Sequence, residues 1–363
     1  MARIHNFSAG PGVLPEKVLH QAQQDLWDVN GSGIGVAEHS HRGKVFDAIH
    51  QSAKARIRRL MRLSDDQEVL FLQGGARSQF YMLPMNLLRG GRAVYLDTGH
   101  WAHSAIDDAK RYGTVDVAFS SKETGYDHVP AAGGWSDVPN DAVYFHYTSN
   151  NTIFGTEFHY VPELRNAGPL LVCDMSSNFL SRPIDGSKFD FVYAGAQKNV
   201  GPSGVVVVIV RKSILPRMET NLPAMLRYAK QVEKDSMLNT PCTFGIYMID
   251  QVCAWLEDDV GGLEAMERRN VAQADKVYAE IDRTGFWRSR VQKASRSRMN
   301  LVFTSGKEDL DTAFHKSASE SGLSGLKGHR ELGGLRASLY NAQTDAAVDA
   351  LVAFMREFER KNG

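Results

Sequence analysis

Two residues that could do chemistry together each follow a short apolar run of the chain. Asp174 comes directly after the apolar residues 170–173, and Lys198 follows the apolar residues 191–193 with four residues between. Ligands of open α/β sheets bind outside the carboxyl ends of the strands. We therefore expect Asp174 and Lys198, which are 198 − 174 = 24 residues apart, to share one site at such an edge.

This pair of side chains suits pyridoxal phosphate (PLP). A lysine amine forms a Schiff base with the PLP aldehyde, and a carboxylate keeps the pyridine nitrogen protonated so that the ring accepts electrons. Spacing alone leaves an alternative open, because aspartates and lysines are common at strand ends. In that alternative, Asp174 caps a helix and Lys198 lies on the surface.

Other positions would serve the same cofactor. Gly74 and Gly75 lie between a predicted strand and a predicted helix, where free backbone N–H groups can bind a phosphate. Trp101 follows another apolar run and could stack on a flat ring, while Thr152 could hydrogen-bond a ring hydroxyl. The loop residues 239–240 could reach phosphate oxygens. A tight turn, core packing and a turn-stabilising threonine are the structural alternatives for these features.

The elements that must position these residues form an α/β pattern. Short apolar runs occur at 69–72, 93–96, 115–119, 142–146, 170–173, 191–193 and 205–210, and helical patterns at 15–27, 44–61, 77–88 and 102–112. This alternation predicts a mainly parallel, seven-stranded type of sheet flanked by helices. We expect an N-terminal arm at 1–15, a large PLP-binding domain at 16–255 and a small α+β domain at 256–363. In the small domain, helices are predicted at 262–281, 309–321 and 345–360, and strands at 299–303 and 335–340.

Composition excludes several classes of function. The 363 residues include 42 Lys and Arg and 42 Asp and Glu, so no basic surplus indicates nucleic-acid binding. The longest apolar run, 205–210, is far shorter than a membrane span, and the first residues show no signal sequence. Cys173, Cys242 and Cys253 form no CxxC pair, so we expect neither a disulfide framework nor a metal site. A cytoplasmic enzyme fits these features.

Several short motifs spread over the whole chain occur together. They are NFSAGP (6–11), SHRGK (40–44), GGARSQF (74–80), SRPID (181–185), YAGAQKN (193–199), NTP (239–241), SRSRMN (295–300) and KGHR (327–330). As an ordered set they resemble the phosphoserine aminotransferase family of class V, fold-type I PLP enzymes. The resemblance implies a fold-type I aminotransferase fold and PLP as the cofactor.

The resemblance also implies a role for each matching residue. Lys198, Asp174 and Trp101 would be catalytic. The cofactor would contact Ala76, Arg77, Trp101, Thr152, Asp174, Gln197, Lys198, Asn239 and Thr240. The substrate anions would contact His41, Arg42, His329, Arg330 and Arg336. Asn239 and Thr240, and also His329 and Arg330, are expected to come from the neighbouring subunit of a homodimer with shared active sites.

The implied reaction is transamination between L-glutamate and 3-phosphohydroxypyruvate, which gives 2-oxoglutarate and O-phospho-L-serine for serine biosynthesis. Members of the family also act on a phosphorylated hydroxythreonine in vitamin B6 synthesis, and no feature of the sequence bears on that use. Arginine suits these substrates independently of the resemblance, because it binds phosphate and carboxylate groups with two hydrogen bonds.

Two alternatives remain. Another class V enzyme, such as an alanine–glyoxylate aminotransferase or a cysteine desulfurase, would share the PLP residues, and a desulfurase would need a mobile catalytic cysteine. A non-enzymatic regulator with an aminotransferase-like domain would need an added DNA-binding segment.

Overall fold

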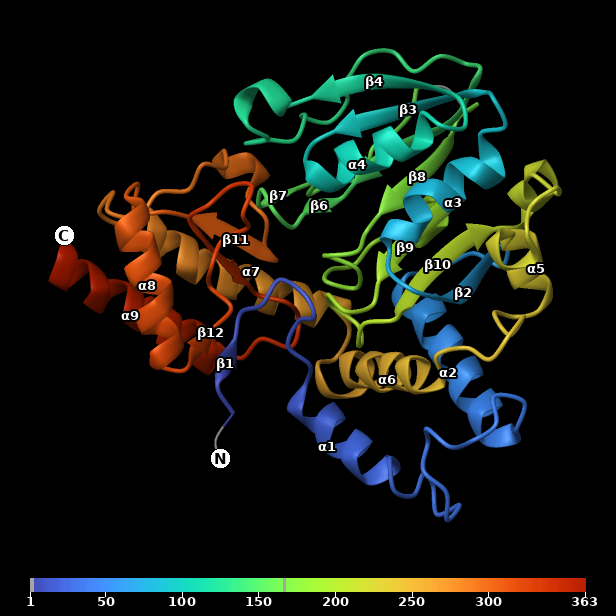
Figure 1. Cartoon of the computed structure of the whole chain (residues 1–363), viewed down its shortest axis with the longest axis horizontal. Helices are drawn as coiled ribbons and strands as arrows, with labels where there is room; N and C mark the ends of the chain where they lie inside the picture. The colour runs from blue at the N-terminus through green and yellow to red at the C-terminus, as the bar shows by residue number, and fades with distance from the viewer. Residues whose placement is uncertain (1–2, 166–167) are drawn as a thin grey trace.

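The computed structural model describes residues 3–165 and 168–363. Within these residues the largest sheet has seven strands. In spatial order they are β2 (Gln67–Gln73), β10 (Val205–Arg211), β9 (Phe191–Gly195), β8 (Leu170–Asp174), β5 (Ala142–Thr148), β3 (Arg92–Asp97) and β4 (Thr114–Ser120). Strand β10 is antiparallel to both of its neighbours, and the other neighbouring pairs are parallel. The predicted mainly parallel α/β sheet is confirmed (Figure 1).

Burial explains why these segments form strands at these places. Every residue of β8 and β9 is buried, and so are the six apolar residues 205–210 of β10. A run that is apolar on both faces suits a strand covered by helices on both sides, and β-branched valine favours the extended backbone. Strand β4 lies at the edge of the sheet and is only partly buried.

Helices cover both faces of this sheet. They are α2 (Lys44–Leu60), α3 (Arg77–Leu87), α4 (His100–Ala109), α5 (Tyr228–Glu233) and α6 (Thr243–Ala254). Helix α1 (Glu16–Asp25) packs on α2 and α6 and not on the sheet. Helices α3, α4 and α5 share one buried apolar cluster with the sheet, whereas α2 and α6 share another. In α2 the buried side chains recur every three or four residues, as an amphipathic helix requires.

The C-terminal part of the chain forms its own layer of helices against short strands (Figure 1). Its elements are α7 (Leu263–Ile281), β11 (Asn300–Phe303), α8 (Glu308–Glu320), β12 (Leu323–Ser324), β13 (Leu335–Ser338) and α9 (Asp345–Asn362). The predicted helices and the predicted strands of this part are confirmed to within about two residues. The helices and strands of this part enclose an apolar cluster, and Phe7 of the N-terminal arm is buried in it.

Several short elements were not predicted from the sequence. They are β1 (His5–Asn6), β6 (Asn150–Asn151), β7 (Thr156–Glu157), the 3-10 turns η1 (Lys122–Thr124), η2 (Gly186–Lys188), η3 (Lys212–Arg217), η4 (Ala224–Leu226) and η6 (Lys293–Ser295), and the π turn η5 (Trp255–Asp259). Strand β1 pairs with β12, which joins the N-terminal arm to the C-terminal layer. Leu263 and Met266 of α7 pack into a cluster of the large sheet, so the domain boundaries at 15 and 255 stay predictions.

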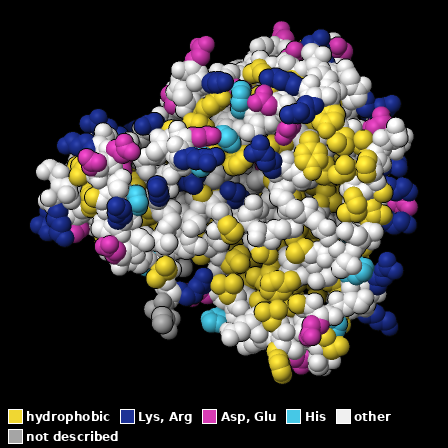
Figure 2. All heavy atoms as spheres, in the orientation of Figure 1, with side chains coloured by type: hydrophobic (Ala, Val, Ile, Leu, Met, Phe, Trp, Pro, Cys, Tyr) yellow, Lys and Arg dark blue, Asp and Glu magenta, His cyan; other side chains and the backbone are white. Residues whose placement is uncertain are grey.

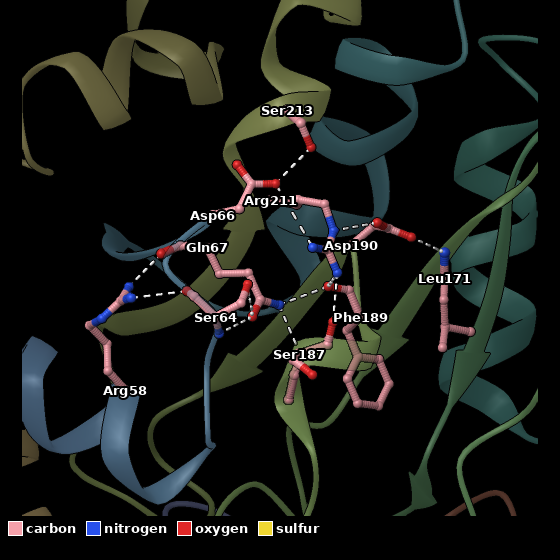
Figure 3. A network of polar contacts seen from close by, with 11 residues as sticks. Arg58, Ser64, Asp66, Gln67, Leu171, Ser187, Phe189, Asp190, Arg211 and Ser213 are labelled. Carbon is pink, nitrogen blue, oxygen red and sulfur yellow. Dashed lines mark hydrogen bonds and ion pairs between the residues drawn. The ribbon is translucent and has the colours of Figure 1, made fainter.

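A polar network fixes the amino-terminal edge of the parallel strands (Figure 3). The Nε of Arg211 donates to the Asp190 carboxylate at 2.7 Å, and the second Asp190 oxygen accepts from the Leu171 backbone N–H at 2.8 Å. Gln67 donates to the carbonyl of Phe189 at 2.8 Å. These contacts join the end of β10 to the starts of β2, β8 and β9, and they leave the opposite edge free for a site. No helix of the described residues is long and apolar enough to cross a bilayer.

Candidate active site

A cavity of about 240 Å³ lies at the carboxyl-terminal edge of the parallel strands. Its lining consists of strand ends and of the first turns of the helices that follow them. The lining residues are Gly75, Ala76, Arg77, Phe80, Trp101, Thr148, Asn150, Thr152, Asp174, Ser176, Ser177, Gln197 and Lys198. Eight of the residues singled out from the sequence are therefore brought together, namely Gly75, Ala76, Arg77, Trp101, Thr152, Asp174, Gln197 and Lys198.

Asp174 is the last residue of β8, and its side chain is buried. One carboxylate oxygen accepts a hydrogen bond from the backbone N–H of Ser176 at 2.9 Å. Burial raises the pKa of Asp174 to about 6, although this hydrogen bond and the nearby Lys198 charge act in the opposite direction. A carboxylate with one satisfied oxygen in a cavity is suited to hold a protonated ring nitrogen.

Lys198 follows β9, and its Nζ donates to the carbonyl oxygen of Ala9 at 2.7 Å. Burial lowers the pKa of Lys198 to about 8, and the positive charge of Arg336 lowers it further, while Asp174 raises it. An amine with such a pKa is partly neutral near physiological pH, so it can attack an aldehyde or accept a proton.

Trp101 lines the cavity because it lies in the first turn of α4, which begins at the cavity. The backbone at Gly99 passes so close to Asn151 that a Cβ atom there would lie 2.5 Å from the Asn151 Oδ1. The Trp101 ring packs against Phe80, with 6.4 Å between ring centroids, and His100 meets its face edge-on at 4.8 Å. This packing holds a flat aromatic surface against the cavity.

The start of α3, which lines the cavity, is suited to bind an anion. Gly74 has φ +104°, which only glycine adopts readily, and it turns the chain into the first turn of α3 at Ala76 and Arg77. Helix N-termini present unpaired N–H groups and a partial positive charge. The Gln197 Oε1 is buried without a hydrogen-bond partner among the described residues and lies in the same lining.

Arg336 of β13 brings a positive charge from the C-terminal layer to this cavity. Its Nη1 donates to the carbonyl oxygen of Thr152 at 3.1 Å. Burial lowers the pKa of Arg336 from its ordinary value, and its Nε has no hydrogen-bond partner among the described residues. A half-buried guanidinium with a free donor is suited to bind a substrate carboxylate.

His329 lies beside the first residue of α4, His100, in its own chain. Its ring centroid is 6.3 Å from that of His100, and the adjacent Glu331 pairs with His100 at 2.9 Å. Burial and the positive charges of Arg336, His100 and Arg330 lower the pKa of His329. Lys, Arg and His side chains gather on the face where α4 meets the C-terminal layer (Figure 2).

One expectation about this turn stays a prediction. We expected His329 and Arg330 to come from the partner subunit. Within the described chain the turn packs onto α4, where Glu331 pairs with His100, and it lies beside β13, which carries Arg336. These contacts within one chain are compatible with a role of the turn in the site of a second subunit.

Four other predicted residues do not line the cavity of their own chain. His41 and Arg42 lie in the loop before α2, where Arg42 is exposed. Asn239 and Thr240 are also exposed, and they contact Gln73: the Gln73 amide donates to the Thr240 carbonyl at 2.5 Å. Their roles in binding stay predictions that require a second subunit.

The sequence analysis assigned no role to several lining residues. They are Phe80, Thr148, Asn150, Ser176 and Ser177. The rule that ligands bind at strand ends could have identified Thr148, which ends β5 beside Asp174. Its hydroxyl is buried and has no hydrogen-bond partner within residues 3–165 and 168–363. Asn150 could not have been identified by this rule. Its position in the lining depends on hydrogen bonds that its amide donates to the Ser177 hydroxyl and the Asn300 Oδ1.

The residues present fit PLP. The cavity offers a carboxylate, a lysine amine, an aromatic face and a helix N-terminus. Two polar atoms of its lining, on Gln197 and Thr148, are buried and have no hydrogen-bond partner in the described part of the chain. No group of three or more His, Cys, Asp and Glu side chains in the described part of the chain is arranged to hold a metal ion.

The fold and the site together define a PLP-dependent aminotransferase, and comparison with known proteins agrees. The aminotransferase class-V family model matches residues 4–351, so the chain belongs to that family. Within it, the chain is 51% identical to a phosphoserine aminotransferase of Nitrosomonas europaea, over 100% of both chains. It is 49% identical to that of Desulfatibacillum aliphaticivorans, over 99% of both.

A solved structure gives the same result. The phosphoserine aminotransferase of Bacillus circulans subsp. alkalophilus superposes with a TM-score of 0.96 at 45% identity, with 99% of each chain covered. More distant structures share the fold alone. An example is an aspartate aminotransferase of Thermus thermophilus, with a TM-score of 0.80 at 18% identity over 98% of this chain and 99% of that one.

Proposed function

We infer that this chain catalyses the PLP-dependent transfer of an amino group between L-glutamate and 3-phosphohydroxypyruvate, which gives 2-oxoglutarate and O-phospho-L-serine for serine biosynthesis. One observation carries this inference. Lys198, Asp174 and Trp101 line one cavity, with Arg336 beside it, in a chain that is 51% identical to a phosphoserine aminotransferase.

Asp174 and Trp101 prepare the cofactor for the reaction. Bound PLP supplies an aldehyde that bonds to amines and a ring that takes up electrons from the substrate α-carbon. The Asp174 carboxylate would hold a proton at the ring nitrogen, and the Ser176 N–H keeps that carboxylate oriented. The Trp101 ring, which lines the cavity, would stack on the cofactor ring and exclude water.

Lys198 would hold the cofactor through its Nζ when no substrate is bound. Once released from the cofactor, the Lys198 Nζ would be a free base beside the substrate. Its lowered pKa lets it accept the α-proton and deliver it again. The second half of the reaction uses the same group in the opposite order.

Substrate selection comes from cations on the C-terminal layer. Arg336 is positioned for the carboxylate that all substrates share. His329 and Arg330, which we expect to reach the site of the partner subunit, would bind there the distal phosphate of 3-phosphohydroxypyruvate or the distal carboxylate of glutamate. L-Serine lacks such a distal anion, so we expect it to be a poor substrate.

The chain acts as a homodimer with shared active sites in this proposal. His41, Arg42, Asn239 and Thr240 lie outside the cavity of their own chain, so a partner's site can receive them. Trp27 is 86% exposed, with Leu26 and Ile34 also exposed, and hydrophobic side chains lie open over α6 (Figure 2). Exposed apolar surface of this kind marks an interface. The unpaired cysteines agree with a cytoplasmic location.

The alternative of a cysteine desulfurase finds no support. Cys173 and Cys253 are buried, and burial raises the pKa of both thiols, which makes them poor nucleophiles. Cys242 is half-buried beside Gly245 at the start of α6 and does not line the cavity.

An absorbance titration tests the proposal. PLP-loaded protein is titrated with O-phospho-L-serine, with L-serine as the control. We expect phosphoserine to convert the lysine-bonded cofactor band to that of the amine form, and L-serine to leave it unchanged. Conversion by neither amino acid would remove the substrate assignment. Lys198→Ala should abolish turnover, and wild-type rates in that variant would refute the role of Lys198.

A further inference from the structure

The main-chain carbonyl of Ala9 lies where three parts of the molecule meet. Its oxygen accepts a hydrogen bond from the Lys198 Nζ at 2.7 Å and another from the Tyr340 hydroxyl, also at 2.7 Å. Ala9 belongs to the N-terminal arm, Lys198 follows β9, and Tyr340 follows β13. Two donors fill the two lone pairs of a carbonyl oxygen, so this atom joins the catalytic lysine to the C-terminal layer.

The Tyr340 hydroxyl also accepts a hydrogen bond from a buried side chain. The Asn300 amide donates to it at 3.3 Å, and the Asn300 Oδ1 accepts from the Asn150 amide at 2.7 Å. Tyr340, Asn300 and Asn150 are all buried, and Asn150 lines the cavity. A buried chain of hydrogen bonds therefore fixes the direction of the hydroxyl and, through it, the Ala9 carbonyl.

The arm also packs directly on the lysine. Gly10 has φ +142°, and a Cβ atom there would lie 2.9–3.1 Å from the Cδ, Nζ and Cε atoms of Lys198. The Gly12 N–H donates to the Gln197 carbonyl at 2.8 Å, and a Cβ on Gly12 would meet the Lys198 carbonyl at 2.6 Å. The two glycines of the NFSAGP segment thus allow the backbone to approach the lysine without a side chain between.

Lys198 needs this neighbour because its Nζ has to exist in two states. It is bonded to the cofactor in one state, and in the other it is a free, buried amine that carries a proton. Among the described residues, the Ala9 carbonyl is the one hydrogen-bond partner of this nitrogen. A buried ammonium without an acceptor is strongly disfavoured.

We propose that Tyr340 is a positioning residue of the reaction: it fixes the Ala9 carbonyl as the resting acceptor of the Lys198 amine whenever that amine is not bonded to the cofactor. The inference rests on the proposed function, in which Lys198 bonds to PLP. It assigns to the N-terminal arm a part in catalysis and not only in packing.

The first test compares two tyrosines that differ in their partner. Tyr340→Phe removes the hydroxyl and keeps the ring. Tyr278→Phe is the matched control, because the Tyr278 hydroxyl also donates to a buried main-chain carbonyl, that of Ser297, at 2.9 Å. For Tyr340→Phe we expect kcat to fall about tenfold, with KM changed less than about twofold. The isotope effect with α-deuterated glutamate should rise, and the control should keep wild-type values.

The same variants are then compared without the cofactor. The pH dependence of Lys198 labelling by an amine-reactive reagent gives the ionisation midpoint of this group. We expect the midpoint to fall in Tyr340→Phe, because the ammonium loses a fixed acceptor, and to stay unchanged in Tyr278→Phe. An unchanged midpoint together with an unchanged isotope effect in Tyr340→Phe would overturn the proposal.

An experiment on the unmodified chain keeps the proposal testable if Tyr340→Phe does not fold. Labelling alanine carbonyls with ¹³C and glycine amides with ¹⁵N selects four Ala–Gly peptide units, of which Ala9–Gly10 is one. We expect one of the four carbonyl signals to titrate together with Lys198 and to stop titrating in Lys198→Ala. Absence of such a signal would overturn the proposal. The proposed function itself fails only if phosphoserine does not convert the cofactor, so the two failures are distinguishable.

Discussion

Burial shifts the pKa values of Asp174 and Lys198 in opposite directions. It raises the pKa of Asp174 to about 6 and lowers that of Lys198 to about 8. Both shifts favour the neutral form, because a low-dielectric cavity stabilises charge poorly. The two groups therefore lie closer to neutral pH than free side chains do, and this suits a reaction in which protons move at neutral pH.

The capture of PLP should report the pKa of Lys198. A lysine attacks an aldehyde only as the neutral amine, so the capture rate of cofactor-free protein should rise with pH and level off above a midpoint near 8. Stopped-flow absorbance over a pH series measures this midpoint. A midpoint near the ordinary value of 10.5 would contradict the burial argument.

The carboxyl group of Asp174 should lower the stability of the cofactor-free protein. Its folded-state pKa lies above the ordinary 3.8, so the folded chain binds the proton more tightly than the unfolded chain does. The free energy of unfolding should therefore fall as pH rises from about 4 through about 6, and stay low above that range.

Asp174→Asn mimics the protonated group and should be more stable than wild type by about 1–3 kcal/mol at pH 7.5. The same variant should lose nearly all transamination, because no charge then holds the proton of the cofactor. Urea unfolding of both proteins without PLP checks the stability, and a destabilised variant would contradict the prediction.

At the scale of elements, the carboxyl-terminal edge of the parallel strands carries the cavity, and the amino-terminal edge carries a stabilising polar network. Parallel strands place the residues that follow β5, β8 and β9 around one cavity, while the opposite edge is closed by the network of Arg211 and Asp190 (Figure 3). Strand β10 runs against its neighbours, so its last residue, Arg211, lies at the amino-terminal edge, where it pairs with Asp190. The contacts that stabilise this edge and the residues that line the cavity therefore lie at opposite ends of the strands.

Asp190→Ala should destabilise the fold without affecting the site. The change leaves the Leu171 N–H without its partner and leaves Arg211 with Asp66, at 3.8 Å, as its remaining carboxylate partner among the described residues. It should cost about 2–3 kcal/mol. Urea unfolding measures the cost, and kcat should remain within about twofold of wild type because the site lies at the other edge. Glu163→Ala is the control: its pair with Lys188 is exposed, so a loss below about 0.5 kcal/mol is expected.

At the scale of the whole molecule, subunit mixing can show which chain supplies each cation. We expect Lys198→Ala and Arg42→Ala chains to be inactive or impaired alone. If Arg42 serves the partner's site, a mixed dimer has one intact site, and random mixing restores about a quarter of wild-type activity. Mixing of Lys198→Ala with His329→Ala should restore a similar fraction, because His329 is expected to serve the partner's site. Absence of restoration in either mixture would assign that residue to the site of its own chain.

The sequence alone determined the order of elements and the chemical centre. Apolar runs such as 205–210 and the periodic pattern of α2 are local properties, so the strands and most helices were predicted close to their observed bounds. Asp174 and Lys198 were paired by one rule, that parallel strands end at one edge. Short elements such as β1 and β6 escaped prediction, because two residues carry no periodicity and form only where a partner strand lies.

Tertiary structure alone decided which distant residues come into contact. The turn that carries His329 packs on α4 of the same chain, and Tyr340 meets Ala9 across 331 residues of sequence. Both results depend on how the C-terminal layer and the N-terminal arm pack against the sheet. Such contacts join segments far apart in the chain, and no local pattern specifies them, whereas the types of residue at strand ends follow directly from the sequence.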